Sequence, residues 1–489
     1  MKRHTLVVSL GAVVCIAAHF LYFAGAGLAV DFTHDDLLNL FRAWYEPLST
    51  HLLDILLFFR HSDDYRPMGV LFYRLLFDSF GFEPAPFRLA FYTLLAIDLV
   101  LAYAVVRRLA NSRLAGVIAA LLLSYNRGFW SMYTNTGFIF DVLCFAFYCG
   151  ALLYYLRARE ERGFLRWRQV AIWSGIYVLC LNSKEMSVTL PVMIAVYEVL
   201  HGRPWTWRAC RVPLAGSALA AAFIFGRVLT RTGLASMEAF HPVLRLDVYL
   251  SHGRHFLSEA LYQPAWLTPI GATALMVVLA AAAIRFRRRS SLPFLFVWML
   301  VTILPVAFIQ QRSLDAVFIP ALGLAAYVAI CVVEGSKRIA PNLNPSIVFL
   351  IVLVPLVCFE SNQGKLDFHS ITEENRHIRK VYRRLQCLDG SIRPGSRILF
   401  LADPFPALDW NSTLITHLSL RERNLHIRRV NWMLKELNPS DPADFDVVLS
   451  WEDDRIRRCD ATRFHNVPVK ELDQPCRRIC TQCPEVDGP

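Results

Sequence analysis

Long apolar stretches separated by short polar connections make up the first three quarters of the chain. Most stretches approach the roughly 20 residues that a helix needs to cross a bilayer, and the shorter ones require tilt or flanking residues. We therefore expect an α-helical polytopic membrane protein with about eleven spans. The expected spans cover residues 5–30, 86–109, 114–125, 138–156, 170–181, 188–200, 212–229, 266–284, 292–309, 316–333 and 347–359.

The remainder of the chain, residues 360–489, contains no comparable stretch. Short strands are expected at 397–401 and 446–450, and a helix at 410–420. The pattern thus predicts two domains, a multi-spanning membrane domain over 1–359 and a small α/β domain over 360–489.

Charge follows the same division and indicates topology. The net charge is +11, but the basic residues gather between apolar stretches rather than on one polar face, which argues against nucleic acid as a partner. With a cytoplasmic N-terminus, every strongly basic connection falls on the cytoplasmic side. An odd number of spans then exports the C-terminal domain, where five of the cysteines favour disulfides over a zinc site.

An acidic pair, Asp35 and Asp36, follows directly after the first span. Thr33 is suited to cap a helix whose first turn carries both carboxylates. The pair is then either a simple helix cap or a reactive pair at the membrane surface. As reactive groups, the two acids suit a general base for an acceptor hydroxyl or ligands for a divalent cation such as Mg²⁺ or Mn²⁺.

Further polar residues are expected on the exported side, in or beside loops that are distant in sequence. They are Tyr65, Arg66, Asp141, Lys184, Glu185 and Arg312. Arginine presents a fork of donors to phosphate oxygens, and lysine presents a point charge. In a simpler interpretation, Lys184 and Glu185 form an ion pair with each other. Arg312 then only marks the membrane edge, where its long side chain reaches the interface.

Five segments carry a resemblance to a known superfamily. They are DDLLNL (35–40), YRPMGVLFYRLL (65–76), TNTGFIFDVLCFAFYCGALLYYLRAR (134–159), NSKEMSVTLP (182–191) and QQRSLDAVFIPALGLA (310–325). Together they resemble the membrane region of GT-C glycosyltransferases, especially the protein O-mannosyltransferases that carry tetratricopeptide repeats and their bacterial relatives. The chain departs from that pattern in lacking the repeats after the last span and a tyrosine in the last segment.

The resemblance implies an inverting transferase that uses a polyprenyl-phosphate sugar. It places Asp35, Asp36 and Asp141 at the catalytic site and Arg66, Lys184 and Arg312 at the donor phosphate, with Tyr65 and Glu185 as neighbours. It leaves metal dependence open.

We therefore predict an enzyme of the bacterial inner membrane that transfers a hexose from a polyprenyl-phosphate carrier to a lipid, glycan or protein acceptor outside the cytoplasm. A transporter or flippase of a lipid-linked glycan is the first alternative, although polar groups near the midplane and inverted repeats are not evident. A non-catalytic membrane scaffold is the second.

Overall fold

The structure is a computed structural model that describes residues 2–59, 65–201, 206–230, 233–286, 291–363, 369–405, 410–430, 444–459 and 480–482. The chain forms two compact units. The first contains residues 1–29, 48–72 and 85–368, and the second contains 30–47, 73–84 and 369–489. We describe each unit by itself, and the domain boundary expected at residue 359 stays a prediction.

The first unit is helical, and each of the eleven expected spans coincides with a helix. These helices are α1 (Lys2–Ala24), α5 (Pro84–Ala110), α6 (Arg113–Ser124), α8 (Ile139–Arg162), α9 (Trp167–Leu181), α10 (Leu190–Leu200), α11 (Trp207–Phe223), α13 (Pro269–Arg285), α14 (Leu292–Thr302), α16 (Phe318–Ile339) and α17 (Pro345–Asn362). Six apolar helical segments in the described residues are long enough to cross a membrane. The predicted fold class, a polytopic helical membrane protein, is confirmed.

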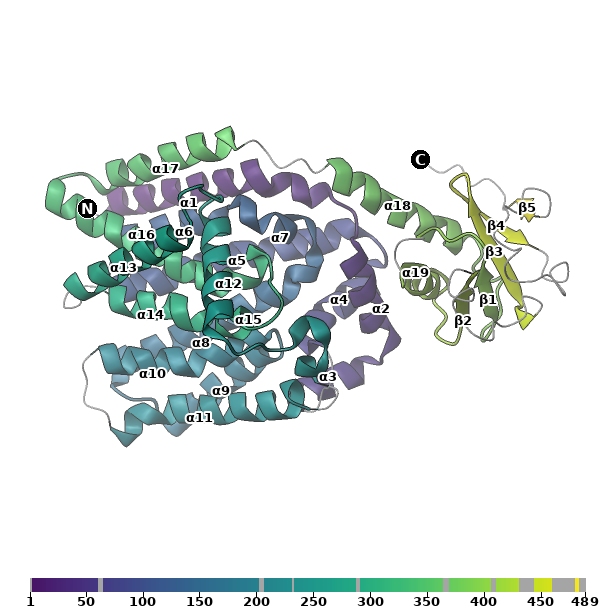
Figure 1. The fold of residues 1–489 in the computed structure, drawn as a ribbon, viewed down its shortest axis with the longest axis horizontal. Helices are drawn as coiled ribbons and strands as arrows, with labels where there is room; N and C mark the ends of the chain where they lie inside the picture. Colours follow the sequence, from purple (N-terminus) through teal and green to yellow (C-terminus); the bar gives the residue numbers. More distant parts are fainter. Residues whose placement is uncertain are drawn as a thin grey trace. The chain divides into compact units, whose positions relative to one another are not determined.

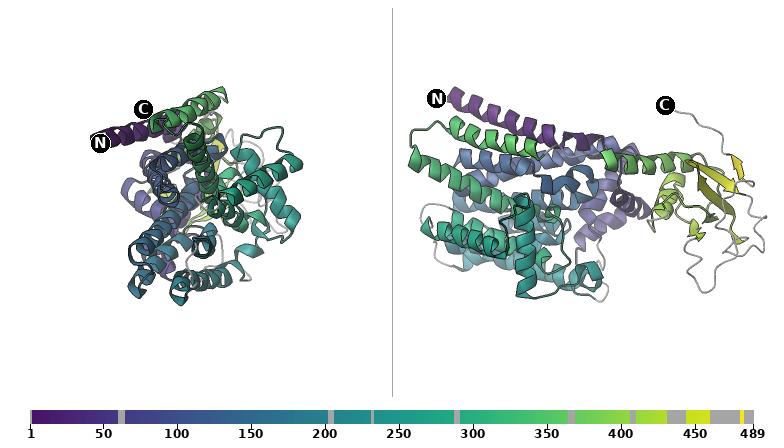
Figure 2. Two further views of the ribbon diagram at one scale, coloured as in Figure 1. Left: turned by 90° about the vertical axis from the view of Figure 1, so that its left-hand side faces the viewer. Right: turned by 45° about the horizontal axis from the view of Figure 1, so that its top comes forward.

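The core of this unit lies around α16, which packs against α6 and α14 (Figure 1). Helices α1 and α17 pack against α6 at the periphery, as the two further views show (Figure 2). Helix α8 pairs with α9, and α10 pairs with α11. Shorter helices complete the unit: α3 (Leu48–Leu56), α7 (Trp130–Thr134), α12 (Leu246–Ala260) and α15 (Leu304–Ala307). Helix α4 (Pro67–Phe80) contributes residues to both units.

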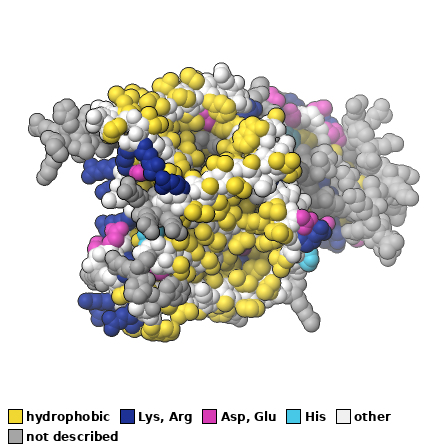
Figure 3. Space-filling view, turned by 60° about the vertical axis from the view of Figure 1, so that its left-hand side comes forward, with side chains coloured by type: hydrophobic (Ala, Val, Ile, Leu, Met, Phe, Trp, Pro, Cys, Tyr) yellow, Lys and Arg dark blue, Asp and Glu magenta, His cyan; other side chains and the backbone are white. Residues whose placement is uncertain are grey.

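Apolar side chains cover a broad face of the molecule, and Lys and Arg gather mainly along one edge of it (Figure 3). Large exposed hydrophobic residues such as Leu89, Ile270 and Ile284 are expected on a surface in contact with lipid. At the basic helix ends, Arg108 of α5 pairs with Glu160 of α8 at 3.3 Å, and Arg338 of α16 lies over the Phe286 ring. The basic ends of these helices therefore meet in pairs, which agrees with the charge pattern of the sequence.

The second unit contains a five-stranded sheet in the order β2-β1-β3-β4-β5. Its strands are β1 (Arg397–Phe400), β2 (His426–Arg429), β3 (Val447–Glu452), β4 (Arg455–Cys459) and β5 (Cys480–Gln482). Strand β1 is parallel to β2 and β3, whereas β3-β4 and β4-β5 are antiparallel. Helices α18 (His369–Gln386) and α19 (Asn411–Leu420) pack together, and α19 also packs against α2 (His34–Tyr45). The small α/β fold expected for the C-terminal region is present.

The sequence analysis missed several elements of this unit. Strands β2 and β4 are rich in arginine, so they lack the run of apolar residues by which β1 and β3 were found. Helix α18 is strongly amphipathic and was not predicted. Of the cysteines expected to form disulfides, Cys476 and Cys483 lie outside the described residues, and the disulfides stay a prediction.

A buried ion pair between α8 and α10 gives a test of the packing. Arg159 binds Glu198 through two nitrogens at 2.8 and 2.9 Å, and the two side chains are only 6% and 5% exposed. Arg159→Met removes the guanidinium from the buried Glu198 carboxylate, which also accepts from the Tyr155 hydroxyl, so we expect a loss of about 3 kcal/mol in stability. Arg157→Met is the control, because the Arg157–Glu161 pair is 71% and 57% exposed. Thermal unfolding of the purified protein in detergent measures the stability of both variants. Equal losses of stability in Arg159→Met and Arg157→Met would contradict the assigned packing.

Candidate functional site

Two adjacent residues, Lys184 and Glu185, form ion pairs with different partners in the first unit. Glu185 accepts from Arg66 in a two-pronged arrangement, with Nη2–Oε2 at 3.0 Å and Nε–Oε1 at 3.1 Å. Lys184 donates to Asp141, which lies in the first turn of α8. The interpretation in which Lys184 and Glu185 pair with each other is therefore wrong, and each instead joins the loop between α9 and α10 to another helix.

The backbone holds the same segments together. The Met68 amide at the start of α4 donates to the Asn182 carbonyl at 3.3 Å. Gly69 lies against the Phe140 ring so closely that a Cβ atom would be 2.1 Å from it. A side chain at position 69 would therefore separate α4 from α8 and, with them, the two ion pairs.

The structure adds Arg227 to this group. It lies at the end of the helix that follows α11, fully buried, with its guanidinium 5.3 Å from the centre of the Phe223 ring. Its charge acts on Glu185. The sequence did carry a signal for this residue, because an arginine inside an apolar stretch, here 212–229, is rare and usually functional.

Arg312 completes the group. Its Nη2 donates to the Ala239 carbonyl at 3.0 Å, and its guanidinium lies 4.6 Å from the centre of the Phe240 ring. Partial burial and the charge of Arg66 lower the pKa of Arg312, against the opposite effect of Glu185. We call the set of Arg66, Asp141, Lys184, Glu185, Arg227 and Arg312 the charged cluster.

The charged cluster has more positive than negative side chains among the residues that the structure describes. Four basic groups share two carboxylates. Burial alone would raise the pKa of Glu185, but the guanidinium groups of Arg66 and Arg227 outweigh it and lower the pKa to about 2. Glu185 is thus an anion at neutral pH, held by guanidinium groups.

The acidic pair lies in the second unit, and its two members have different surroundings. Asp36 is fully buried. Its Oδ1 accepts from the Tyr73 hydroxyl, and its Oδ2 accepts from the Thr33 amide at 2.8 Å and hydroxyl at 3.0 Å. Thr33 and Asp36 form a capping box, as the helix-cap interpretation predicts for this residue. Asp35 is exposed, in the first turn of the same helix.

The acidic pair does not fit a cation well. Both oxygens of Asp36 already accept hydrogen bonds in a buried environment. In the described part of the chain, no three His, Cys, Asp or Glu side chains are grouped as metal ligands. We therefore assign no step to Mg²⁺ or Mn²⁺. Tyr65, another predicted neighbour of the site, has its hydroxyl 2.5 Å from Nδ1 of His51.

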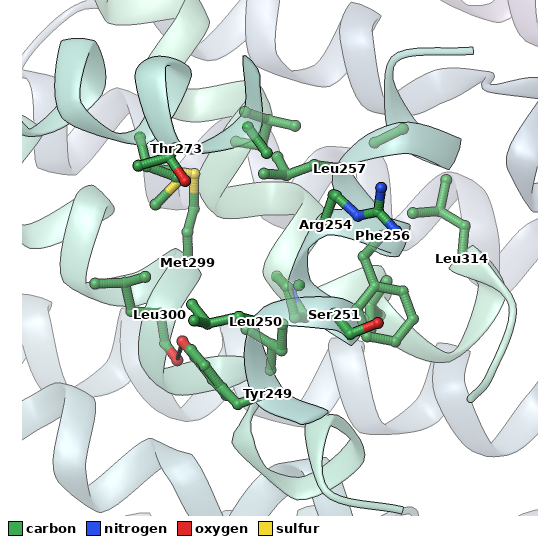
Figure 4. Close-up of a pocket in the computed structure, with 18 of the residues that line it drawn as sticks. Tyr249, Leu250, Ser251, Arg254, Phe256, Leu257, Thr273, Met299, Leu300 and Leu314 are labelled. Atoms are coloured by element: carbon green, nitrogen blue, oxygen red, sulfur yellow. Dashed lines mark hydrogen bonds between the residues drawn. The ribbon is translucent and has the colours of Figure 1, made fainter. Parts of the chain in front are cut away.

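An apolar cavity of about 560 Å³ lies in the first unit between α12, α13, α14 and α16 (Figure 4). Tyr249, Met299 and Leu300 line it, and its charged lining residues are Asp247 and Arg254. Leu314 and Val317 also line it, and they belong to a short 3-10 helix that begins two residues after Arg312. The cavity thus extends to the segment that carries one arginine of the charged cluster.

Comparison with known families gives a match to part of the chain. Residues 63–229 match the model of the dolichyl-phosphate-mannose-protein mannosyltransferase family. The match supports a GT-C mannosyltransferase-like membrane protein. No curated protein matched the chain.

The matched range contains five members of the charged cluster: Arg66, Asp141, Lys184, Glu185 and Arg227. It begins after Asp35 and Asp36 and ends before Arg312. The resemblance noted in the sequence is confirmed, and a membrane-embedded glycosyltransferase is indicated. The roles of single residues and the convergence of the acidic pair with the charged cluster stay predictions.

The paired state of Glu185 predicts how stability depends on pH. Its folded pKa of about 2 lies below the ordinary value of 4.5. The carboxylate of Glu185 therefore stabilises the fold above about pH 4.5, and this contribution is lost as the pH falls toward about 2. We expect Glu185→Gln to lower the melting temperature at about pH 7. We also expect the melting temperature of this variant to fall less than that of the wild type between about pH 5 and pH 3. Thermal scans in detergent measure the melting temperature at each pH, and Glu161→Gln, at an exposed position, is the control. Parallel curves of melting temperature against pH for wild type and Glu185→Gln would contradict the lowered pKa of Glu185.

Proposed function

We propose that this protein transfers a hexose from a polyprenyl-phosphate carrier to a lipid, glycan or protein acceptor on the extracytoplasmic side of a bacterial inner membrane. The observation that carries the proposal is the charged cluster itself, five of whose six members lie in the range that matches the mannosyltransferase family. A membrane protein maintains such charges at a cost, and they usually mark a site for an ion or substrate.

The charged cluster acts on the donor phosphate. In transfer, the acceptor oxygen forms a bond to the anomeric carbon of the sugar, and the bond between that carbon and the phosphate oxygen breaks. The phosphate leaves on its carrier with one more negative charge than it had as a diester. Arg66, Arg227 and Arg312 supply donors where this charge develops, which stabilises the transition state more than the bound donor.

Asp35 acts on the acceptor hydroxyl. Its exposed carboxylate in the first turn of α2 suits a general base that removes the hydroxyl proton during attack. Asp36 supports this role from the interior, because its bonds to Tyr73 and Thr33 fix the beginning of the helix. The two aspartates therefore have separate tasks, catalysis for Asp35 and structure for Asp36.

The apolar cavity accepts part of the prenyl chain. Its walls consist mostly of apolar side chains, and it extends to within two residues of Arg312. A chain in this position keeps its hydrocarbon out of water while its phosphate lies near the guanidinium groups.

The substitutions Asp35→Asn and Asp36→Asn test the division of tasks. We expect Asp35→Asn to reduce sugar transfer by about 100-fold or more at an unchanged melting temperature. Asp36→Asn should lower stability by about 1 kcal/mol, because it weakens the capping box.

The measurement is transfer of label from a panel of radiolabelled polyprenyl-phosphate sugars by membranes with matched protein levels. Asp453→Asn is the control, because the Asp453 side chain is 90% exposed on the same unit. Full transfer by Asp35→Asn would exclude Asp35 as the base.

The cavity predicts sensitivity to the length of the prenyl chain. Ala321 lines the cavity, whereas Ala274 is exposed on α13 outside it. Ala321→Phe should raise the KM for a long-chain donor about tenfold and leave a short-chain donor nearly unchanged, because only the long chain requires the full cavity. Ala274→Phe should change neither KM. Steady-state kinetics with both donors measures this, and an equal rise for the two donors would contradict a role in holding the chain.

A further inference from the structure

Helix α2 has only 12 residues, so its position depends on packing more than on its own helical propensity. In the second unit it packs against α19 of the C-terminal region, which we define as residues 369–405 and 410–430. Besides the bonds from Tyr73 and Arg74 of α4, three contacts to the C-terminal region hold it, at the segment before the helix, at its first turn and at its last turn.

The first contact is at Asp31, three residues before the helix. The Asn375 side chain donates to the Asp31 carbonyl at 3.3 Å, and Arg379 lies 3.5 Å from its carboxylate. Arg379 also pairs with Glu83 at 2.8 Å. Helix α18 therefore holds the chain where it enters α2.

The second contact is at His34, the residue directly before Asp35. The Asn411 amide donates to Nδ1 of His34, and the Phe405 ring packs edge-on against the imidazole with 6.2 Å between ring centres. Asn411 is 5% exposed. The imidazole is thus held on two sides by the C-terminal region, and its position fixes the rotation of the first helical turn.

The third contact is at Trp44, near the end of the helix. Nη2 of Arg423 donates to the Trp44 carbonyl at 2.9 Å, and the guanidinium lies 5.3 Å from the centre of the Trp44 ring. With the end of the helix held as well, α2 cannot tilt or rotate without breaking contacts to the C-terminal region.

We propose that the C-terminal region positions Asp35 for proton transfer, and that His34 and Asn411 are positioning residues for this purpose. The inference rests on the proposed function, in which Asp35 is the base. A misplacement of about 1 Å costs up to about 100-fold in rate, so contacts that fix the first turn of α2 control turnover without touching the substrate.

A double-mutant cycle on the full-length protein in nanodiscs tests this. His34→Ala and Asn411→Ala should each lower kcat about tenfold or more and change the donor KM by less than about twofold. The double variant should lose no more than the more affected single variant, because both remove the same contact. His426→Ala and Asn424→Ala are the matched controls, since both residues are exposed in the same unit, and they should retain wild-type kinetics.

A second readout does not require activity. Hydrogen–deuterium exchange of residues 34–45 should accelerate about tenfold in Asn411→Ala and Arg423→Ala and remain unchanged in Asn424→Ala. A general loss of folding would instead raise exchange throughout the sheet.

The results separate the two proposals. Unchanged kcat in Asn411→Ala, with transfer abolished by Asp35→Asn, would overturn positioning and leave the proposed function intact. Additive losses of kcat in His34→Ala, Asn411→Ala and the double variant would also overturn positioning. Full transfer by Asp35→Asn would overturn the assignment of Asp35 as the base and, with it, positioning for catalysis. The exchange data would then still decide whether the C-terminal region holds α2.

Discussion

Two ion pairs made by neighbouring residues determine the arrangement of the first unit around its charged cluster. Lys184 binds Asp141 at the start of α8, and Glu185 binds Arg66 just before α4. Buried charges are costly unless they are paired and hydrogen-bonded. Because consecutive residues take partners on different helices, the loop between α9 and α10 has little freedom, and the close contact of Gly69 with Phe140 depends on the same arrangement.

The acidic pair illustrates how adjacent residues on one helix acquire different surroundings. Successive side chains of a helix point about 100° apart, so one carboxylate of a neighbouring pair can be buried while the other reaches solvent. Asp36 is buried against Tyr73 and closes the capping box with Thr33, whereas Asp35 is exposed. The helix-cap and reactive interpretations of the pair are therefore compatible, one for each residue.

The apolar stretches located a helix at every expected span, and six apolar helical segments in the described residues are long enough to cross a bilayer. Residue type and order also identified five members of the charged cluster. Their pairing was not predictable, since Arg66 and Glu185 are 119 residues apart and nothing local specifies the contact. Arg227 was missed although an intramembrane arginine is a signal by itself. The association of α2 with α19 was equally inaccessible, because 377 residues separate His34 from Asn411.

The pairing of the arginines also bears on the chemistry that we propose. A site of unpaired buried guanidinium groups would hold a phosphate tightly both before and after transfer, which would slow product release. In the charged cluster, Glu185 and Asp141 already occupy donors of Arg66 and Lys184. A donor phosphate must therefore exchange partners with these carboxylates, so ground-state binding is weakened. The additional negative charge that develops on the leaving phosphate competes better for the same donors, and the cluster thereby favours the transition state over the bound donor.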